Sequence, residues 1–193
     1  MNQKTKSIVA IGILTAIVIV LQAMAIGIRF GTFSITLVLI PIVVGASLYG
    51  WKAGAWLGLV FGVVVLFTDA SAFLAISIPG TIITCILKGV LAGTVSGIVY
   101  SIFAKKNRWL AVIASAIVCP LVNTGVFLLG CSVFFLDTIK EWAQGAGFES
   151  VGTYMIVGFV GINFLIEMGV NILLSTAIVR ILNIVHPAKE QNA

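Results

Sequence analysis

Long apolar stretches separated by short polar or glycine-bearing turns dominate the hydrophobicity pattern of the chain. A helix needs about 20 mostly apolar residues to cross the hydrocarbon of a bilayer, and irregular backbone is not tolerated against lipid. The pattern therefore predicts an all-α integral membrane protein, a six-transmembrane-helix bundle in which residues 1–193 form a single membrane domain. The approximate spans are 8–28, 34–50, 52–68, 79–103, 108–136 and 153–185.

The longest segment outside these spans, residues 137–152, is predicted to be an outer loop with a short amphipathic helix. The break between the second and third runs is the weakest, so an odd number of spans is an alternative. A second alternative concerns the N-terminus, where Lys4, Lys6 and Ala23-Met24-Ala25 also resemble a secretory signal. The first run continues to Ile28, however, which favours a full membrane span.

The positions of the basic residues predict the orientation of the bundle. Lys and Arg are enriched on the cytoplasmic side of membrane proteins. With six spans and both termini cytoplasmic, eight of the 11 basic residues lie inside, two lie outside and Lys88 lies within the membrane. The inner residues are Lys4, Lys6, Lys52, Lys105, Lys106, Arg108, Arg180 and Lys189, and the outer ones are Arg29 and Lys140.

Composition excludes several classes of protein. Of the 193 residues, 61% are hydrophobic and 9% are charged, and the mean hydropathy is +1.23, so a water-soluble fold is excluded. The three cysteines lie in apolar runs without a CxxC pair, which indicates neither a disulfide framework nor a metal site. No phosphate loop, HExxH or GxSxG motif occurs. We therefore expect no enzyme activity, no metal, no cofactor and no nucleic-acid partner.

Small residues recur every four positions on two of the predicted helices, at Gly54, Gly58 and Gly62 and at Gly89, Gly93 and Gly97. Such stripes let helices approach closely, and internal packing is the favoured interpretation. The first run has a similar line at Gly12, Ala16, Ala23 and Gly27. For this line, internal packing and contact with a partner protein are both open.

Two ionisable residues lie deep in predicted spans, Lys88 and Glu167. A charge near the bilayer centre costs roughly 2.5–3.5 kcal/mol even on a lenient scale, so it normally faces a cavity or a partner. Further polar groups lie at similar depth on the same three spans. They are Thr81 and Thr84 beside Lys88, Asn123 and Thr124 after Pro120, and Asn163 and Asn171 on the face of Glu167.

Two interpretations of these polar groups remain open. A Lys88–Glu167 ion pair could lock two helices together. Alternatively, the three spans enclose a pocket open to the outside, in which Lys88 meets an anionic ligand group and the Asn and Thr side chains bind its polar atoms. Arg29 and Phe33 after the first span, and Trp142 in the outer loop, could cap such a pocket.

These features together resemble the substrate-binding S component of energy-coupling factor (ECF) vitamin transporters. The resemblance is carried by Gly12-xxx-Ala16, where the family usually has Ala-xxx-Ala, and by two segments similar to those of its riboflavin, folate and pantothenate branch. These segments are Pro79-Gly80-Thr81 to Lys88-Gly89 and Pro120-Leu-Val-Asn123-Thr124-Gly125-Val-Phe127.

The resemblance implies a high-affinity capture subunit of an ABC importer in a prokaryotic cell membrane. Its implied partners are a transmembrane coupling protein, which would contact Gly12 and Ala16, and two ATPase subunits that would hydrolyse ATP.

One buried cation with several Asn and Thr groups favours pantothenate, which is small, anionic and hydroxylated. Folate has two carboxylates and would call for more cations, and riboflavin would call for a broader aromatic slot. An S component for folate or riboflavin therefore remains an alternative. A self-sufficient secondary transporter or channel with a Lys88–Glu167 ion relay is another, although no internal repeat supports it.

Overall fold

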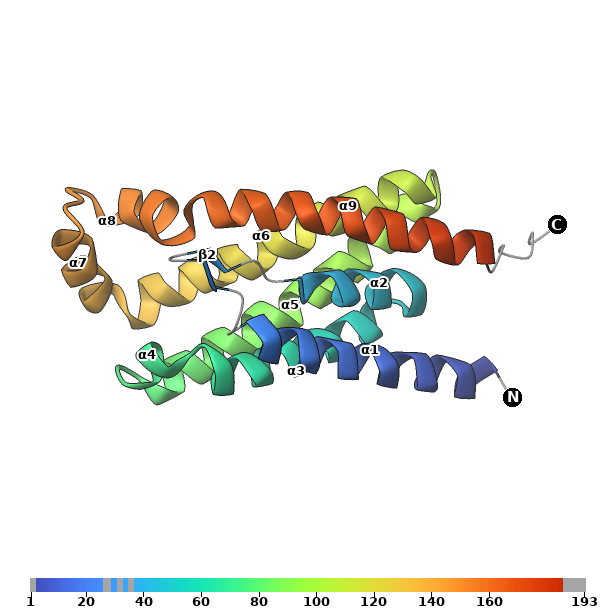
Figure 1. The fold of residues 1–193 in the computed structure, drawn as a ribbon, viewed down its shortest axis with the longest axis horizontal. Coiled ribbons are helices and arrows are strands. Elements are labelled where there is room, and N and C mark those ends of the chain that lie inside the picture. The colour runs from blue at the N-terminus through green and yellow to red at the C-terminus, as the bar shows by residue number, and fades with distance from the viewer. Residues whose placement is uncertain (1–2, 26–28, 31–32, 35–36, 186–193) are drawn as a thin grey trace.

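A computed structural model describes residues 3–25, 29–30, 33–34 and 37–185, and in it helices run along the long axis of an elongated bundle (Figure 1). The elements are α1 (Gln3–Ala25), β1 (Arg29–Phe30), β2 (Phe33–Ser34), α2 (Leu39–Tyr49), α3 (Trp51–Thr68), α4 (Ser71–Leu74), α5 (Ile78–Ala104), α6 (Arg108–Phe134), α7 (Leu136–Gly145), α8 (Val151–Thr153), the π-helix η1 (Tyr154–Val160) and α9 (Gly161–Val185).

Four described helices are long and apolar enough to cross a membrane, namely α1, α3, α5 and α6. The fold is therefore a helical membrane bundle. The helix α7 coincides with the amphipathic helix predicted in the outer loop, with Ile139 and Ala143 buried along it.

The second predicted span, 34–50, is wrong in its first part. Phe33–Ser34 pairs antiparallel with Arg29–Phe30 as a two-stranded sheet, and the helix begins only at Leu39. An 11-residue helix extends about 16 Å, half the thickness of the hydrocarbon. Nine of its residues, Leu39 to Ser47, are buried. A short helix enclosed by protein has the same apolar sequence as one facing lipid, so hydrophobicity alone could not distinguish them.

The last predicted span, 153–185, is wrong as a single uninterrupted helix. Residues Tyr154–Val160 form a π-helix, and α9 begins directly after it at Gly161, which has φ 47°. Positive φ is readily adopted by glycine, so Gly161 provides the break between the two helices. Part of α9, Phe164–Ala177, is apolar but shorter than the four long helices.

The two glycine stripes face each other across α3 and α5, which confirms their predicted role in internal packing. The contacts pair Gly54 with Gly93, Gly58 with Gly89, and Gly62 with Cys85. A Cβ added at any of these glycines would collide with a backbone carbonyl of the facing helix. The helices can therefore lie backbone to backbone only because side chains are absent there.

The small residues of α1 behave differently. No atom lies within 4 Å of where a Cβ on Gly12 would be, and Ala16 and Ala23 are exposed. A different side of α1 contacts α3, because Trp56 Nε1 on α3 donates a hydrogen bond to Thr15 Oγ1 on α1 at 3.1 Å. The Gly12–Ala16 face is thus not used for packing within the described part of the chain.

A side-chain hydrogen bond connects α9 to α6 near Pro120. Proline has no N–H, so the carbonyl oxygen of Ala116 loses its intrahelical donor. Asn171 Nδ2 replaces it by donating to Ala116 O at 2.7 Å, and Ser175 Oγ donates to Asn171 Oδ1 at 3.3 Å. The buried Asn171 therefore holds α9 against α6.

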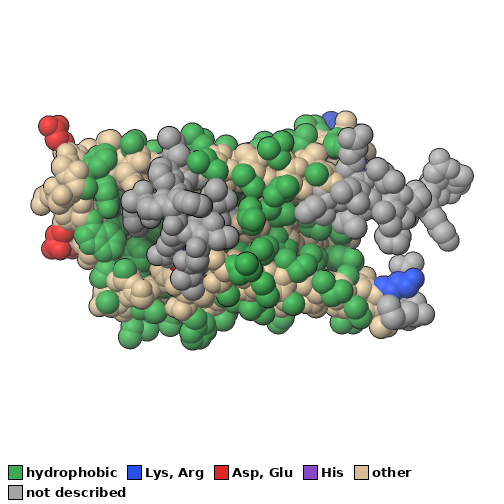
Figure 2. Space-filling model, viewed as in Figure 1, with side chains coloured by type: hydrophobic (Ala, Val, Ile, Leu, Met, Phe, Trp, Pro, Cys, Tyr) green, Lys and Arg blue, Asp and Glu red, His purple; other side chains and the backbone are tan. Residues whose placement is uncertain are grey.

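The two ends of the bundle differ in charge, while apolar side chains cover much of the flank between them (Figure 2). The start of α1, the α2–α3 turn and the α5–α6 turn lie at one end (Figure 1). Their exposed basic residues are Lys4, Lys6, Lys52, Lys105, Lys106 and Arg108. The other end holds α7, where Lys140 lies 2.8 Å from Asp137 and lowers the pKa of that exposed carboxyl. Exposed pairs of this kind contribute little to stability.

Candidate ligand-binding cavity

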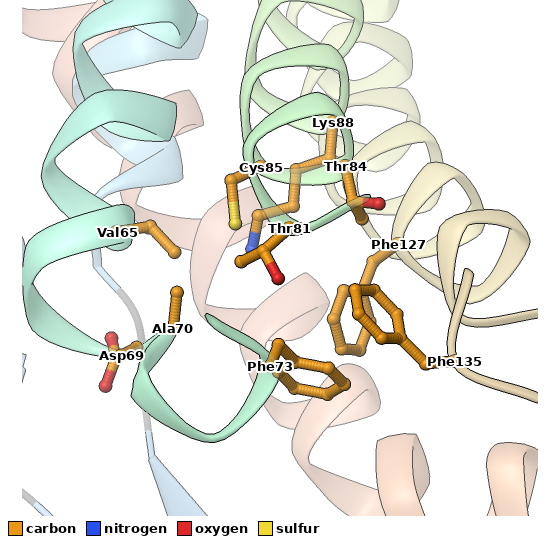
Figure 3. Close-up of a pocket in the computed structure, with 10 residues that line it drawn as sticks. All are labelled: Val65, Asp69, Ala70, Phe73, Thr81, Thr84, Cys85, Lys88, Phe127 and Phe135. Atoms are coloured by element: carbon orange, nitrogen blue, oxygen red, sulfur yellow. The ribbon is translucent and has the colours of Figure 1, made fainter. Parts of the chain in front are cut away.

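A cavity of about 140 Å³ lies between the end of α3, α4, α5 and α6, toward the α7 end of the bundle (Figure 3). Its walls are mostly apolar and aromatic, with four polar side chains among them. The lining residues are Val65, Asp69, Ala70, Phe73, Thr81, Thr84, Cys85, Lys88, Phe127 and Phe135.

The side chain of Lys88 reaches into this cavity (Figure 3). Helical side chains lean toward the N-terminus of their helix, and α5 begins at the α7 end, so the ammonium extends toward that end. Lys88 Nζ lies 5.4 Å from the ring centroid of Phe61 and 5.3 Å from that of Phe127. Aromatic faces stabilise a cation at such distances without using its N–H donors.

Within the part of the chain that the structure describes, Lys88 forms no ion pair within 4 Å and Nζ donates no hydrogen bond. In particular, its ammonium does not pair with the carboxylate of Glu167, which makes other interactions. The ion-pair interpretation of these two residues is therefore wrong for this structure. A half-buried ammonium with three unused donors is a suitable site for an anionic group.

Thr84 lies one turn and Thr81 two turns from Lys88 on the same helix, as predicted, and both line the cavity. Thr81 Oγ1 donates to the carbonyl of Ser77 at 2.7 Å, which leaves its lone pairs as acceptors. Thr84 Oγ1 is buried without a hydrogen-bond partner. It lies in the space that a side chain at Gly130 would occupy.

An aromatic cluster closes one side of the cavity. Phe73 packs edge to face against Phe127 at 5.8 Å, Phe135 at 5.0 Å and Trp142 at 5.8 Å between ring centroids. The predicted capping residue Trp142 thus lies behind Phe73 rather than in the lining. Such edge-to-face pairs fix the positions of the rings that bound the cavity.

Asp69 is a lining residue that the sequence analysis missed. It follows the last residue of α3, and Gln22 Nε2 on α1 donates to Asp69 Oδ2 at 2.6 Å and to Thr68 Oγ1 at 3.2 Å. Gln22 is only 2% exposed. The available signal was that Asp69 is one of only six acidic residues and directly follows an apolar run.

The remaining predicted site residues are not among those that line the cavity. Asn123 and Thr124 are half-buried on α6, and Asn123 Oδ1 is buried without a hydrogen-bond partner. Glu167 is half-buried on α9, and Asn171 on the same helix binds α6 as described above. The side chains of Arg29, Phe33 and Asn163 lie outside the described part of the structure.

Comparison with known proteins agrees with this architecture. A family model for the ECF transporter, substrate-specific component, matches residues 6–179. The chain is also 27% identical over 159 residues to the pantothenic acid transporter PanT of Lactococcus lactis subsp. cremoris (strain MG1363), covering 75% of each chain. No solved structure matches the chain. Because the family model spans most of its length, the chain belongs to the family of substrate-specific components of ECF transporters, which are multi-pass proteins of the prokaryotic plasma membrane.

Proposed function

We propose that this S component captures pantothenate at the outer side of the membrane. The observation that carries the proposal is the Lys88 ammonium, which points into a small, mostly apolar cavity and donates no hydrogen bond to any residue that the structure describes. A carboxylate placed there would accept charge-assisted hydrogen bonds. Thr81 and Thr84 offer further hydrogen-bonding groups beside it.

The size of the cavity supports a small ligand. Its volume of about 140 Å³ is below the roughly 300–1,000 Å³ of sites for drug-sized molecules. Pantothenate is short and flexible, whereas riboflavin carries a rigid three-ring system and folate is longer and has two carboxylates. The similarity to a pantothenic acid transporter supports the same choice.

The arrangement of the ends supports a six-span topology with both termini in the cytoplasm. The start of α1 and the end of α9 lie at the same end of the bundle (Figure 1), where the exposed Lys and Arg also lie. In this topology the cavity would lie nearer the outer surface. Positively charged ends favour the cytoplasm.

The chain would act with an ECF coupling protein and two ATPase subunits, which would hydrolyse the ATP. The exposed Gly12 and Ala16 are our candidate contact with the coupling protein, because small residues allow a partner helix to approach closely. We also retain Asn123, Thr124, Asn163 and Glu167 as candidate ligand contacts, with Arg29, Phe33 and Trp142 as candidate caps. Asn171 would act through the packing of α9 on α6.

Titration calorimetry on the purified protein in detergent tests this proposal. Pantothenate should bind at one site, and riboflavin or folate in excess should fail to displace it. Saturable binding of riboflavin or folate in its place would overturn the choice of pantothenate. Uptake by cells that lack every coupling ATPase would overturn the S-component mechanism and favour a self-sufficient transporter.

A further inference from the structure

Threonine hydroxyl groups within the described helices share one hydrogen-bonding pattern. Four of them donate their hydrogen to the backbone carbonyl four residues earlier in the chain. These bonds join Thr15 to Ile11 at 2.8 Å, Thr68 to Val64 at 3.1 Å, Thr81 to Ser77 at 2.7 Å and Thr94 to Val90 at 2.6 Å. A hydroxyl group has one hydrogen and two lone pairs, so each of these oxygens can act toward other groups only as an acceptor.

Two of these threonine oxygens accept a second hydrogen bond, from a side chain on another helix. Trp56 Nε1 on α3 donates to Thr15 Oγ1 on α1 at 3.1 Å. Gln22 Nε2 on α1 donates to Thr68 Oγ1 on α3 at 3.2 Å. In this protein, a threonine whose hydrogen is used by its own helix therefore still accepts from a donor that approaches from outside that helix.

Thr81 has the same first hydrogen bond but faces the cavity. It is only 2% exposed, and its oxygen is directed into the space beside Phe73 and Phe127 (Figure 3). None of the described residues donates a hydrogen bond to this oxygen. A molecule bound in the cavity can therefore supply the second donor that Trp56 and Gln22 supply to the other two threonines.

Lys88 and Thr81 offer opposite hydrogen-bonding groups to such a molecule. The ammonium of Lys88 only donates, whereas the oxygen of Thr81 can only accept. The helix rises about 10 Å from Thr81 to Lys88, and the lysine stem leans back toward the N-terminus of α5, which shortens the separation between the two groups. Both groups border a single cavity of about 140 Å³. A ligand that binds both therefore carries an anionic group and an N–H or O–H donor only a few bonds apart.

We propose that the cavity is selective for N-acyl-β-amino acids, in which an amide N–H lies two carbons from the carboxylate. The carboxylate meets the ammonium of Lys88 and the N–H donates to Thr81 Oγ1, so Thr81 is a specificity-determining residue. This inference rests on the proposed function, because Lys88 must hold the carboxylate for the N–H to reach Thr81. An analogue without the N–H places no donor at the Thr81 oxygen, and a site that has lost such a partner binds more weakly.

The competing explanation is that Thr81 only stabilises the first turn of α5 through its bond to Ser77. Replacing Thr81 would then weaken the binding of every ligand by the same factor. If Thr81 accepts from the ligand, its replacement weakens only those ligands that carry the N–H. The ratio of two affinities therefore distinguishes a ligand contact from a structural role.

The experiment compares two probes by titration calorimetry on the full-length protein in detergent, with pantothenate as the reference ligand. One probe is N-(2-hydroxy-3,3-dimethylbutanoyl)-β-alanine, which is pantothenate without its terminal hydroxyl group. The other is the matching ester, 3-(2-hydroxy-3,3-dimethylbutanoyloxy)propanoate, in which oxygen replaces the amide N–H. The terminal hydroxyl is left out of both probes because it would cleave the ester by forming a lactone. The wild-type protein should prefer the amide by about fivefold to tenfold.

Thr81→Val has nearly the shape of the wild-type side chain but no acceptor, so it should lower the preference for the amide at least threefold. Thr81→Ser keeps the hydroxyl group and should retain the preference within about twofold of the wild-type value. Thr94→Val is the matched control, because Thr94 makes the same bond on the same helix but does not line the cavity. It should change neither affinity. Thr81→Ala replaces Thr81→Val if the valine variant does not fold.

Two results would overturn the inference and leave the proposed function standing. One is a wild-type protein that binds pantothenate without preferring the amide probe to the ester. The other is an unchanged preference in the variant that lacks the Thr81 hydroxyl group. If the wild-type protein does not bind pantothenate, the proposed function fails first, and the inference with it.

Discussion

Lys88 shows how a membrane protein can keep a cation that pairs with no carboxylate among the described residues. Two aromatic faces lie 5.4 and 5.3 Å from its ammonium, and such contacts contribute roughly 0.5–2 kcal/mol each. They offset part of the cost of holding the charge in the membrane. They also leave the N–H donors available to a ligand.

We expect Lys88→Met to weaken pantothenate binding by about 1.5–3 kcal/mol, or roughly tenfold to more than a hundredfold in Kd, because a hydrogen bond to a charged group is lost. Thermal stability should change little, since Lys88 forms no ion pair with another described residue. Binding and melting in detergent measure the two effects. Lys140→Met, at an exposed lysine of α7, is the control. Unchanged affinity in Lys88→Met would remove Lys88 from the site.

A second prediction at the scale of single residues concerns the effect of Asn171 on the stability of the protein. Asn171→Leu should lower stability by about 1–3 kcal/mol, because the buried carbonyl of Ala116 loses its donor. In a Pro120→Ala background, the new backbone N–H can satisfy that carbonyl, so the same substitution should cost less. Melting temperatures of the four proteins in this double-mutant cycle measure the coupling. Equal costs in both backgrounds would mean that the amide does not compensate for the proline.

At the scale of elements, two helices use the same small-residue pattern for opposite purposes. On α3 the glycines meet the backbone of α5, whereas on α1 the Gly12 position is open. The spacing of small residues in the sequence cannot distinguish the two helices, because α1 and α3 both present a flat stripe of small residues. The difference lies in whether the fold brings another helix to the stripe.

This contrast predicts different effects of the same substitution on the two helices. Gly12→Leu should leave folding and pantothenate binding of the isolated protein intact but abolish uptake, because the side chain would block the proposed coupling helix. Gly58→Leu should instead destabilise the protein itself by about 3 kcal/mol or more, since its side chain would collide with the Gly89 carbonyl. Uptake assays, binding and melting of both variants provide the measurements. Loss of binding in Gly12→Leu would assign that face to internal packing.

At the scale of the whole molecule, charge divides the bundle into a basic end and an end that carries α7 (Figure 2). The apolar flank between them suits the hydrocarbon, so the bundle can lie in the bilayer in one of two orientations. The distribution of Lys and Arg decides between these orientations.

Topology mapping tests the orientation directly. A cysteine introduced at Asn107, in the α5–α6 turn, should react with a membrane-impermeant thiol reagent only after the cells are opened. One introduced at Gln144 on α7 should react in intact cells. The native cysteines Cys85, Cys119 and Cys131 are buried, so the parent protein provides a low background. Labelling at Asn107 in intact cells would contradict the proposed orientation.

Much of the candidate site on α5 was predictable, because Thr81, Thr84 and Lys88 share one helical face whatever surrounds the helix. The role of Asn171 in holding α9 against α6 was not predictable, because its partner carbonyl lies 55 residues away in the chain. Asp69 was missed for a similar reason. It is placed at the cavity by the α3–α4 turn and held by Gln22, 47 residues distant.

The sequence by itself determined the membrane environment, the long helices and the face shared by Lys88 and the threonines, because these follow from local hydrophobicity and the period of the helix. Only the tertiary structure decided that α2 is a buried helix whose length is about half the thickness of the hydrocarbon. It also decided that the α3 glycines are covered by another helix while Gly12 is open, and that Asp69 and Lys88 line the same cavity. These properties depend on which helices become neighbours. In an apolar chain, side chains that face lipid and side chains that face protein are chemically alike, so the pattern does not specify the neighbours.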